Sequence, residues 1–197
     1  MFDTIILLTG PGEQAALSAL LLGHNPGLSI RAVAAREELD TIAPELLAHA
    51  RLIGFVTPVL VPARILGALG YGAYNFHPGP PEYPGWMPSH FAIHDGASCF
   101  GVTAHVMAAR VDAGPIVGVE RFAVPPDANV QALEELAYLH LARLLWKLAA
   151  GLATQSEPLC QLAIVWSGRK TTRRMYEAMR EIPIDMSKER HLMKRAG

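Results

Sequence analysis

The chain has 197 residues, of which 51% are hydrophobic and 18% are charged, and its formal net charge is −1. This length fits one domain with a sizeable core, and the balanced charge excludes the basic footprint that binds a nucleic-acid backbone. There is no positively charged leader and no run of about 20 apolar residues that could span a bilayer. We therefore expect a cytoplasmic globular protein. Its two cysteines, Cys99 and Cys160, stand far apart without a C-x-x-C context, which predicts two buried free thiols rather than a disulfide or a metal site.

Apolar runs alternate with helical patterns through the first half of the chain. Residues 4–8 are typical of a buried strand, and a Gly-Pro-Gly loop and a helix over about residues 13–22 follow. The loop lacks the third glycine of a dinucleotide-binding fingerprint, although the helix N-terminus could still hold an anionic part of a substrate. Further strands are predicted at residues 28–34, 52–56 and 72–76, and helices begin at Pro44 and Ala63. This rhythm predicts an α/β fold, Rossmann-like, with a central mostly parallel sheet flanked by helices.

The strand at residues 72–76 runs into Asn75-Phe76-His77-Pro78. Because side chains alternate along a strand, Asn75 and His77 should point to the same face. They would lie at the carboxyl end of the strand, where open parallel sheets bind their ligands. The next residues, 78–88, are so rich in proline and glycine that they predict a rigid loop. Pro88 then opens a short helix that ends at Gly96.

A carboxylate follows on a turn between two further strands. Residues 101–108 alternate apolar and polar side chains as a half-buried strand does, and residues 116–124 form a second strand-like run. Asp112 lies on the glycine-containing turn between them. An amide, an imidazole and a carboxylate can stabilise an oxyanion and move a proton without a metal or a covalent nucleophile. Asn75, His77 and Asp112 are therefore the predicted catalytic residues.

The pattern of residues 125–197 predicts helices and a strand that pack on the domain rather than catalytic residues. Asp127 or Asn129 caps a long helix that Gly151 ends, and the leucines and Trp146 of this helix leave room for a homodimer interface. A short strand is expected at residues 162–166, followed by a basic run at residues 167–174 that is either a solvated surface or a phosphate contact. A last short helix would be capped by Asp185 or Ser187. We thus expect a catalytic domain at residues 1–155 and a C-terminal extension, not an independent domain, at residues 156–197.

Five motifs in this order resemble a known family. They are Asn-x-His-Pro at residues 75–78, a Pro/Gly-rich loop at 79–85, Ala-Ile-x-x-Gly at 92–96, Gly-Val-Thr-x-His at 101–105 and Asp-x-Gly-x-Ile at 112–116. The series resembles the formyltransferases that use 10-formyltetrahydrofolate, which include the glycinamide ribonucleotide and methionyl-tRNA formyltransferases. Asn-x-His alone would have no specificity, whereas five elements at family-like spacing are specific. The resemblance covers residues 51–124 and is weaker over residues 1–50.

The resemblance implies the formyltransferase fold and transfer of a formyl group from 10-formyltetrahydrofolate to an amine. Asn75 and His77 would stabilise the tetrahedral intermediate, and Asp112 would move a proton and raise the pKa of His77. Thr103 and His105 match residues that hold a water beside the carboxylate. The pterin would lie against a loop before Asn75 and the turn before Asp112, bound by Val59, Leu60, Val61, Arg110, Val111 and Asp112. A plain hydrophobic turn is the competing interpretation of residues 59–61.

Two other activities fit the same residues. One is hydrolysis of the formyl donor, and the other is a non-catalytic module that binds folate or a nucleotide. The presence of Asn75, His77 and Asp112 argues against the second, because binding alone would not require all three. Residues 79–85 depart from the Ser-Leu-Leu-Pro run usual in the family, which leaves the identity of the small-molecule amine acceptor open. The tRNA-directed members carry a further C-terminal domain for which this chain has no room, so we expect no nucleic-acid partner without a further domain, and no membrane partner.

Overall fold

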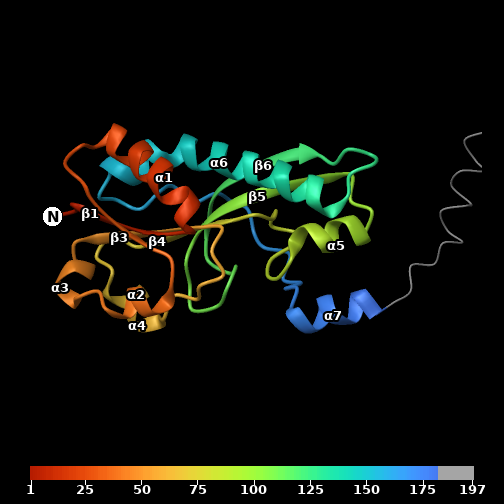
Figure 1. The fold of residues 1–197 in the computed structure, drawn as a ribbon, viewed down its shortest axis with the longest axis horizontal. Helices are drawn as coiled ribbons and strands as arrows, with labels where there is room; N and C mark the ends of the chain where they lie inside the picture. Colours follow the sequence, from red (N-terminus) through yellow and green to blue (C-terminus); the bar gives the residue numbers. More distant parts are fainter. Residues whose placement is uncertain (182–197) are drawn as a thin grey trace, which may run out of the picture.

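A six-stranded sheet, with strand order β2-β1-β3-β4-β5-β6, organises the chain (Figure 1). The computed structural model describes residues 1–181. The strands are β1 Thr4–Leu8, β2 Ser29–Val33, β3 Ala50–Phe55, β4 Ala73–His77, β5 Cys99–Val106 and β6 Ile116–Ala123. The first four strands pair in parallel, and β5 and β6 pair antiparallel at one edge. This confirms the predicted α/β fold with a mostly parallel sheet.

Helices cover both faces of the sheet. They are α1 Pro11–His24, α2 Arg36–Asp40, α3 Pro44–Leu47, α4 Ala63–Ala68, α5 Pro88–His94, α6 Val130–Thr154 and α7 Arg173–Glu181. Figure 1 shows α1 and α6 on one face and α2, α3 and α4 on the other. Two hydrophobic clusters match these two layers, and β1 and β3 are buried along their whole length between them. Such burial explains why these strands read as continuous apolar runs. No helix among residues 1–181 is long and apolar enough to cross a membrane.

Five local predictions need correction or refinement. Cys99 and Cys160 are free thiols, but both are exposed rather than buried. The short helix α2 was not predicted, because only Leu39 of its five residues is buried and the segment is otherwise polar. Strand β5 is buried on both faces rather than half-buried, since α6 packs on one face and the loop after β4 reaches the other through Gly79. Helix α6 is capped by Asn129, whose side chain accepts from the Ala132 N–H, and it continues past Gly151 to Thr154.

The prediction of a strand at residues 162–166 is wrong. This segment makes no ladder, and its only backbone contact with β6 is the Leu162 N–H bonded to the Ile116 carbonyl at 2.8 Å. Residues 155–172, which we call the C-terminal strap, therefore contain neither helix nor strand between α6 and α7. The helix predicted to begin at Asp185 or Ser187 lies outside the described residues.

A buried arginine ties the sheet to the end of α6. Arg51 in β3 is fully buried, and its guanidinium donates to the carbonyl oxygens of Tyr71, Gly151, Leu152 and Glu157. Its charge also lies over the rings of Phe2 and Tyr74, at 4.8 and 5.5 Å from their centres. The guanidinium thus satisfies carbonyls of the last turn of α6 and fixes the first residues of the strap.

We expect Arg51→Lys to lower the free energy of unfolding by at least about 2 kcal/mol. A lysine lacks the planar fork that reaches several carbonyls at once, and each buried acceptor left unpaired costs about 1–3 kcal/mol. Chemical denaturation measures this loss, with Arg36→Lys as the matched control. Because Arg36 is exposed and pairs only with Asp40, its replacement should stay within about 0.5 kcal/mol of the parent. Equal stability of the two variants would contradict the role given to Arg51.

Candidate active site

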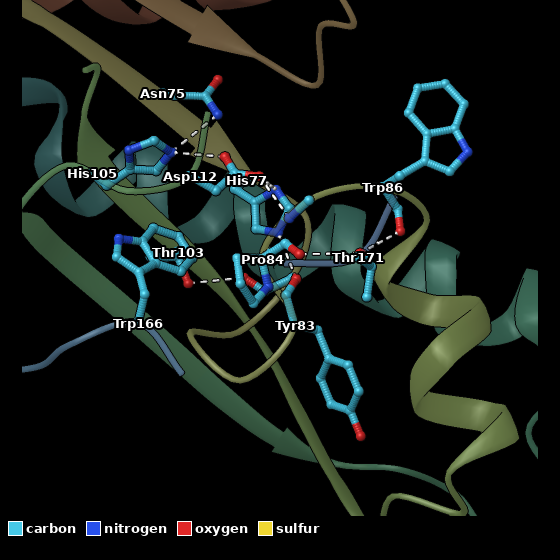
Figure 2. A network of polar contacts seen from close by, with 12 residues as sticks. Asn75, His77, Tyr83, Pro84, Trp86, Thr103, His105, Asp112, Trp166 and Thr171 are labelled. Carbon is cyan, nitrogen blue, oxygen red and sulfur yellow. Dashed lines mark hydrogen bonds and ion pairs between the residues drawn. The ribbon is translucent and has the colours of Figure 1, made fainter. Parts of the chain in front are cut away.

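The pairing of β4 with β5 brings the polar residues of both strands together. In the antiparallel register Asn75 lies opposite His105, and His77 lies opposite Thr103. Asp112 stands on the turn that links β5 to β6, close to the carboxyl end of β4. Figure 2 shows the side chains of Asn75, His77, His105 and Asp112 directed toward one another. Asn75, His77 and Asp112, the predicted catalytic residues, thus lie together, and their catalytic roles stay a prediction.

Asp112 is the centre of the cluster. Its Oδ1 lies 3.2 Å from Nε2 of His105, and its Oδ2 lies 3.5 Å from Nδ1 of His77. Oδ2 also accepts a 2.8 Å hydrogen bond from the Gly85 N–H. Burial favours the neutral carboxylic acid, but the hydrogen bond from His105, the charges of both imidazoles and the Gly85 N–H outweigh it and lower the pKa of Asp112 to about 2. The carboxylate is therefore ionised at neutral pH.

His77 is held from both sides of its ring. Nε2 donates to the Tyr83 carbonyl oxygen at 3.1 Å, so Nδ1 is the nitrogen that faces the carboxylate. Burial holds the pKa of His77 below its ordinary value, although the charge of Asp112 and the Tyr83 carbonyl act in the opposite direction. Asp112 thus raises the pKa of His77, as predicted, but burial outweighs this effect and the net shift is downward. The sequence shows the neighbouring carboxylate but not the loss of solvent around the ring.

Asn75 and His105 complete the cluster. Nδ2 of Asn75 lies 3.2 Å from Nε2 of His105, and Nδ1 of His105 lies 2.9 Å from the Val106 carbonyl oxygen, to which it donates. Nε2 of His105 thus lies between the Asn75 amide and the Asp112 carboxylate. Asn75 is only partly buried, so its amide remains open to a ligand.

Thr103 contacts the loop after β4 rather than Asp112. Its buried hydroxyl donates to the Gly79 carbonyl oxygen at 2.8 Å. The hydroxyl proton is occupied by this bond, so Thr103 could serve a water only as an acceptor. The predicted water-positioning role of Thr103 and His105 stays a prediction.

Two cavities meet at Asn75 and Asp112. The smaller, of about 130 Å³, is lined by all six residues predicted to bind the pterin: Val59, Leu60, Val61, Arg110, Val111 and Asp112. The larger, of about 790 Å³, adds His77 and extends along Trp86 to Lys170 and Arg173. Two of its basic lining residues thus come from the predicted basic run. Within residues 1–181, no group of three or more His, Cys, Asp or Glu side chains could hold a metal ion.

Backbone strain gathers around the larger cavity. Three non-glycine residues described by the structure have positive φ angles, namely Val56 at 44°, Met87 at 52° and Asp112 at 48°. All three line the larger cavity. Such conformations persist only where the surrounding structure imposes them, and they cluster at functional sites.

Four residues of the site were not predicted. Tyr83 and Gly85 contribute a backbone carbonyl and a backbone N–H, respectively, which leave no side-chain signal in a sequence. Trp166 and Thr171 come from the C-terminal strap and reach the site only through the fold (Figure 2). The sequence offered one hint to this part of the site, a glycine within a proline-rich loop. Gly85 has a φ of 103°, which other residues rarely adopt.

The fold and the site together define a Rossmann-like α/β protein with a carboxylate–imidazole–amide cluster at the carboxyl edge of its parallel strands. Residues 26–139 match the sequence model of the family described as "Formyl transferase". This match covers more than half of the chain, and the protein belongs to the formyl transferase family.

Curated relatives match over part of their own length. The methionyl-tRNA formyltransferase of Listeria monocytogenes is 29% identical over 125 residues, which are 63% of this chain and 38% of that protein. The enzyme of the same name from Enterococcus faecalis is 30% identical over 159 residues, which are 80% of this chain and 49% of that protein. The chain thus spans half or less of the length of these relatives.

Solved structures share the fold at low sequence identity. A sugar N-formyltransferase from a Shewanella species superposes with a TM-score of 0.75 at 14% identity, covering 94% of this chain and 82% of that chain. The phosphoribosylglycinamide formyltransferase of Bacillus halodurans superposes with a TM-score of 0.61 at 20% identity, covering 79% of this chain and 97% of that chain. These similarities confirm the formyltransferase fold that the motifs implied.

Proposed function

We propose that this protein transfers a formyl group from 10-formyltetrahydrofolate to the amine of a small molecule. The observation that carries the proposal is the cluster of Asn75, His77 and Asp112 at the junction of two cavities. Two substrates that react with each other need adjoining sites with the catalytic groups between them. A structural relative from Anoxybacillus kamchatkensis, with a TM-score of 0.72 at 17% identity over 93% of each chain, was solved with a formamido nucleotide sugar and tetrahydrofolate.

The smaller cavity suits the pterin of the donor. Its wall combines the apolar side chains of Val59, Leu60 and Val61 with backbone groups of the turn before Asp112. Flat heterocycles bind in such apolar sites, where a few fixed polar groups set their orientation. The formyl group would then extend toward Asn75 and Asp112, which line both cavities.

The larger cavity suits the amine acceptor. Its volume of about 790 Å³ is ample for a substrate larger than an amino acid. Lys170 and Arg173 contribute to its lining, which favours an acceptor that carries an anionic group such as a phosphate. Glu134 also lines this cavity and would repel an anion placed beside it.

In the proposed mechanism the amine attacks the formyl carbon, whose oxygen becomes an oxyanion while the attacking nitrogen becomes positive. The Asn75 amide donates to the oxyanion. Nδ1 of His77 is available to accept the proton of the attacking nitrogen, directly or through a water, because Nε2 already carries a proton bonded to the Tyr83 carbonyl. The ionised Asp112 stabilises the resulting imidazolium.

The second half of the reaction returns the proton. The imidazolium N–H of His77 can also donate to the oxyanion, which makes His77 the second oxyanion donor. When the carbonyl re-forms, the bond from the formyl carbon to N10 breaks and N10 takes up the proton. The products are the formamide and tetrahydrofolate. This order of steps requires a neutral His77 in the resting protein, and burial favours that form because it lowers the pKa of His77.

Replacing Leu60 by aspartate should weaken binding of 5-formyltetrahydrofolate, a stable analogue of the donor, at least tenfold. Leu60 is 61% exposed at the mouth of the smaller cavity, so a bound pterin would cover it and would have to desolvate the new charge. Titration followed by calorimetry or fluorescence measures the affinity. Leu139→Asp is the matched control, because Leu139 is 64% exposed on α6 and lines neither cavity. Equal affinities of the two variants would show that the donor site is misplaced.

A further inference from the structure

The C-terminal strap, residues 155–172, lies against the catalytic cluster although it is distant from it in sequence. It follows α6 and therefore falls outside residues 26–139, which match the family. Its contacts with the loop after β4 include the Ser167 N–H bonded to the Pro81 carbonyl at 2.9 Å and a parallel bridge between Thr171 and Gly85. The strap thus fixes the loop whose backbone reaches His77 and Asp112.

Thr171 holds this loop on both sides of Gly85. Its N–H donates to the Pro84 carbonyl at 2.8 Å, and its own carbonyl accepts from the Trp86 N–H at 3.1 Å. The Thr171 hydroxyl, which is buried, lies 2.7 Å from the Trp86 carbonyl oxygen and 3.0 Å from that of Pro84. A Cβ at Gly85 would collide with the Thr171 carbonyl, so the two segments lie in closest contact at this point.

Thr171 hydrogen-bonds to Pro84 and Trp86, which are adjacent in sequence to the residues that contact the catalytic groups. The Gly85 N–H donates to Oδ2 of Asp112, and the carbonyl of Tyr83 accepts from His77. Any displacement of residues 84–86 therefore moves the partner of Asp112, which is the Gly85 N–H. It also moves the partner of His77, because the Tyr83 carbonyl belongs to the peptide bond with Pro84. Figure 2 shows the bonds of Thr171 to the Pro84 and Trp86 carbonyls, with Tyr83 and the cluster beside them.

Trp166 contacts the cluster from the strap as well. Its indole N–H donates to the Gly114 carbonyl at 2.8 Å, two residues beyond Asp112. Its ring lies edge-to-face against His105 and His77, with centroids 5.1 and 6.0 Å apart. One side chain thus anchors the Asp112 turn and packs against both imidazoles.

We propose that the strap is a working part of the catalytic centre, in which Thr171 and Trp166 are positioning residues for Asp112, His77 and His105. Thr171 acts by fixing the Gly85 N–H and the Tyr83 carbonyl, and Trp166 acts by fixing the imidazole rings. Small displacements of catalytic groups have large kinetic effects, because a misplacement of about 1 Å can cost about a hundredfold in rate. The kinetic part of this proposal rests on the proposed formyl transfer.

The kinetic test compares Thr171→Val with Thr171→Ser. Valine keeps the shape and both backbone bonds of Thr171 but removes the hydroxyl, whereas serine restores the hydroxyl. We expect the valine variant to lose at least tenfold in kcat with little change in the KM for the folate, and the serine variant to stay within threefold of the parent. Thr154→Val is the control, because that exposed hydroxyl bonds only to the Ala150 carbonyl within α6. Equal kcat values for the valine and serine variants would overturn the proposal.

A second readout needs no turnover and so separates this proposal from the proposed function. NMR titration of the ring nitrogens reports the pKa of His77 in the ligand-free protein. The titratable groups that face His77 are Asp112 from the turn and His105 from β5. Burial lowers the pKa of His77, so a loosened loop that admits water should raise it toward its ordinary value in Thr171→Val but not in Thr171→Ser.

Trp166 is tested by the same titration. Trp166→Leu removes the aromatic edge from both imidazoles and should shift the ring resonances of His77 and His105 and the titration of His77, whereas Trp166→Phe keeps a ring and should shift them less. Thermal unfolding of each variant shows that it is folded at the temperature of measurement. If His77 titrates identically in the parent, Thr171→Val and Trp166→Leu, the strap does not position the site. A shifted titration in a protein without transferase activity would support the strap and contradict only the proposed function.

Discussion

Replacing Asp112 by asparagine should lower kcat at least about 10³-fold with a verified amine acceptor. Asparagine keeps the shape of the side chain but removes the charge that two imidazoles and the Gly85 N–H surround. Without that charge the buried His77 has no counterion for the imidazolium that the mechanism forms. Affinity for the folate should change little, because the carboxylate acts mainly on the transition state. Steady-state kinetics with a parallel folate titration measure both quantities.

The matched control for this substitution is Asp127→Asn. Asp127 is exposed on the loop before α6 and lines neither cavity, so its variant should keep parental turnover. Near-parental turnover of Asp112→Asn would mean that proton transfer does not depend on this carboxylate. A large loss of folate affinity in the same variant would instead make Asp112 a binding residue.

Truncating either oxyanion donor should cost at least about 10²–10³-fold in kcat, which is the usual effect of removing one such donor. Asn75→Ala removes the amide that is open to the ligand, and His77→Ala removes both the proton acceptor and the second donor. Because both residues line the larger cavity rather than hold the core, the folded protein should persist in each variant.

His49→Ala is the control for the histidine variant. His49 is exposed, lines neither cavity, and its ring hydrogen-bonds to the first residue of the chain. Its replacement should leave kcat unchanged. Losses of less than tenfold in both Asn75→Ala and His77→Ala would place oxyanion stabilisation on other groups.

The side chains that converge were predictable because the motifs place them at strand ends. Strands β1, β3 and β4 read as apolar runs since the sheet buries both of their faces. Asn75 and His77 share one strand, and the antiparallel return of β5 brings His105 beside them. Because the connection from β5 to β6 is short, Asp112 must lie close to the end of β5. Local pattern and fold thus agree at these positions.

The parts that could not be predicted depend on long-range contacts or on burial. Thr171 bonds to Trp86 and Pro84, which lie 85 and 87 positions earlier in the chain, and no local pattern encodes such distant partners. The segment at residues 162–166 has strand-forming residues, yet Val165 is 85% exposed, because a strand also needs a neighbour with a matching edge. The lowered pKa of His77 likewise follows from the residues packed around it rather than from the motif.

The fate of the formyl group of 10-formyltetrahydrofolate distinguishes transfer to an amine from hydrolysis and from binding alone. Tetrahydrofolate, formate and formamide are quantified with and without a panel of amines that includes phosphorylated and nucleotide-linked amino compounds, using Asp112→Asn as the blank. The proposed function predicts that tetrahydrofolate forms only with an amine, one-to-one with the formamide, and that Asp112→Asn abolishes both. Formate released without any amine would identify a hydrolase instead. Folate that binds but never loses its formyl group across the panel would contradict catalysis at this site.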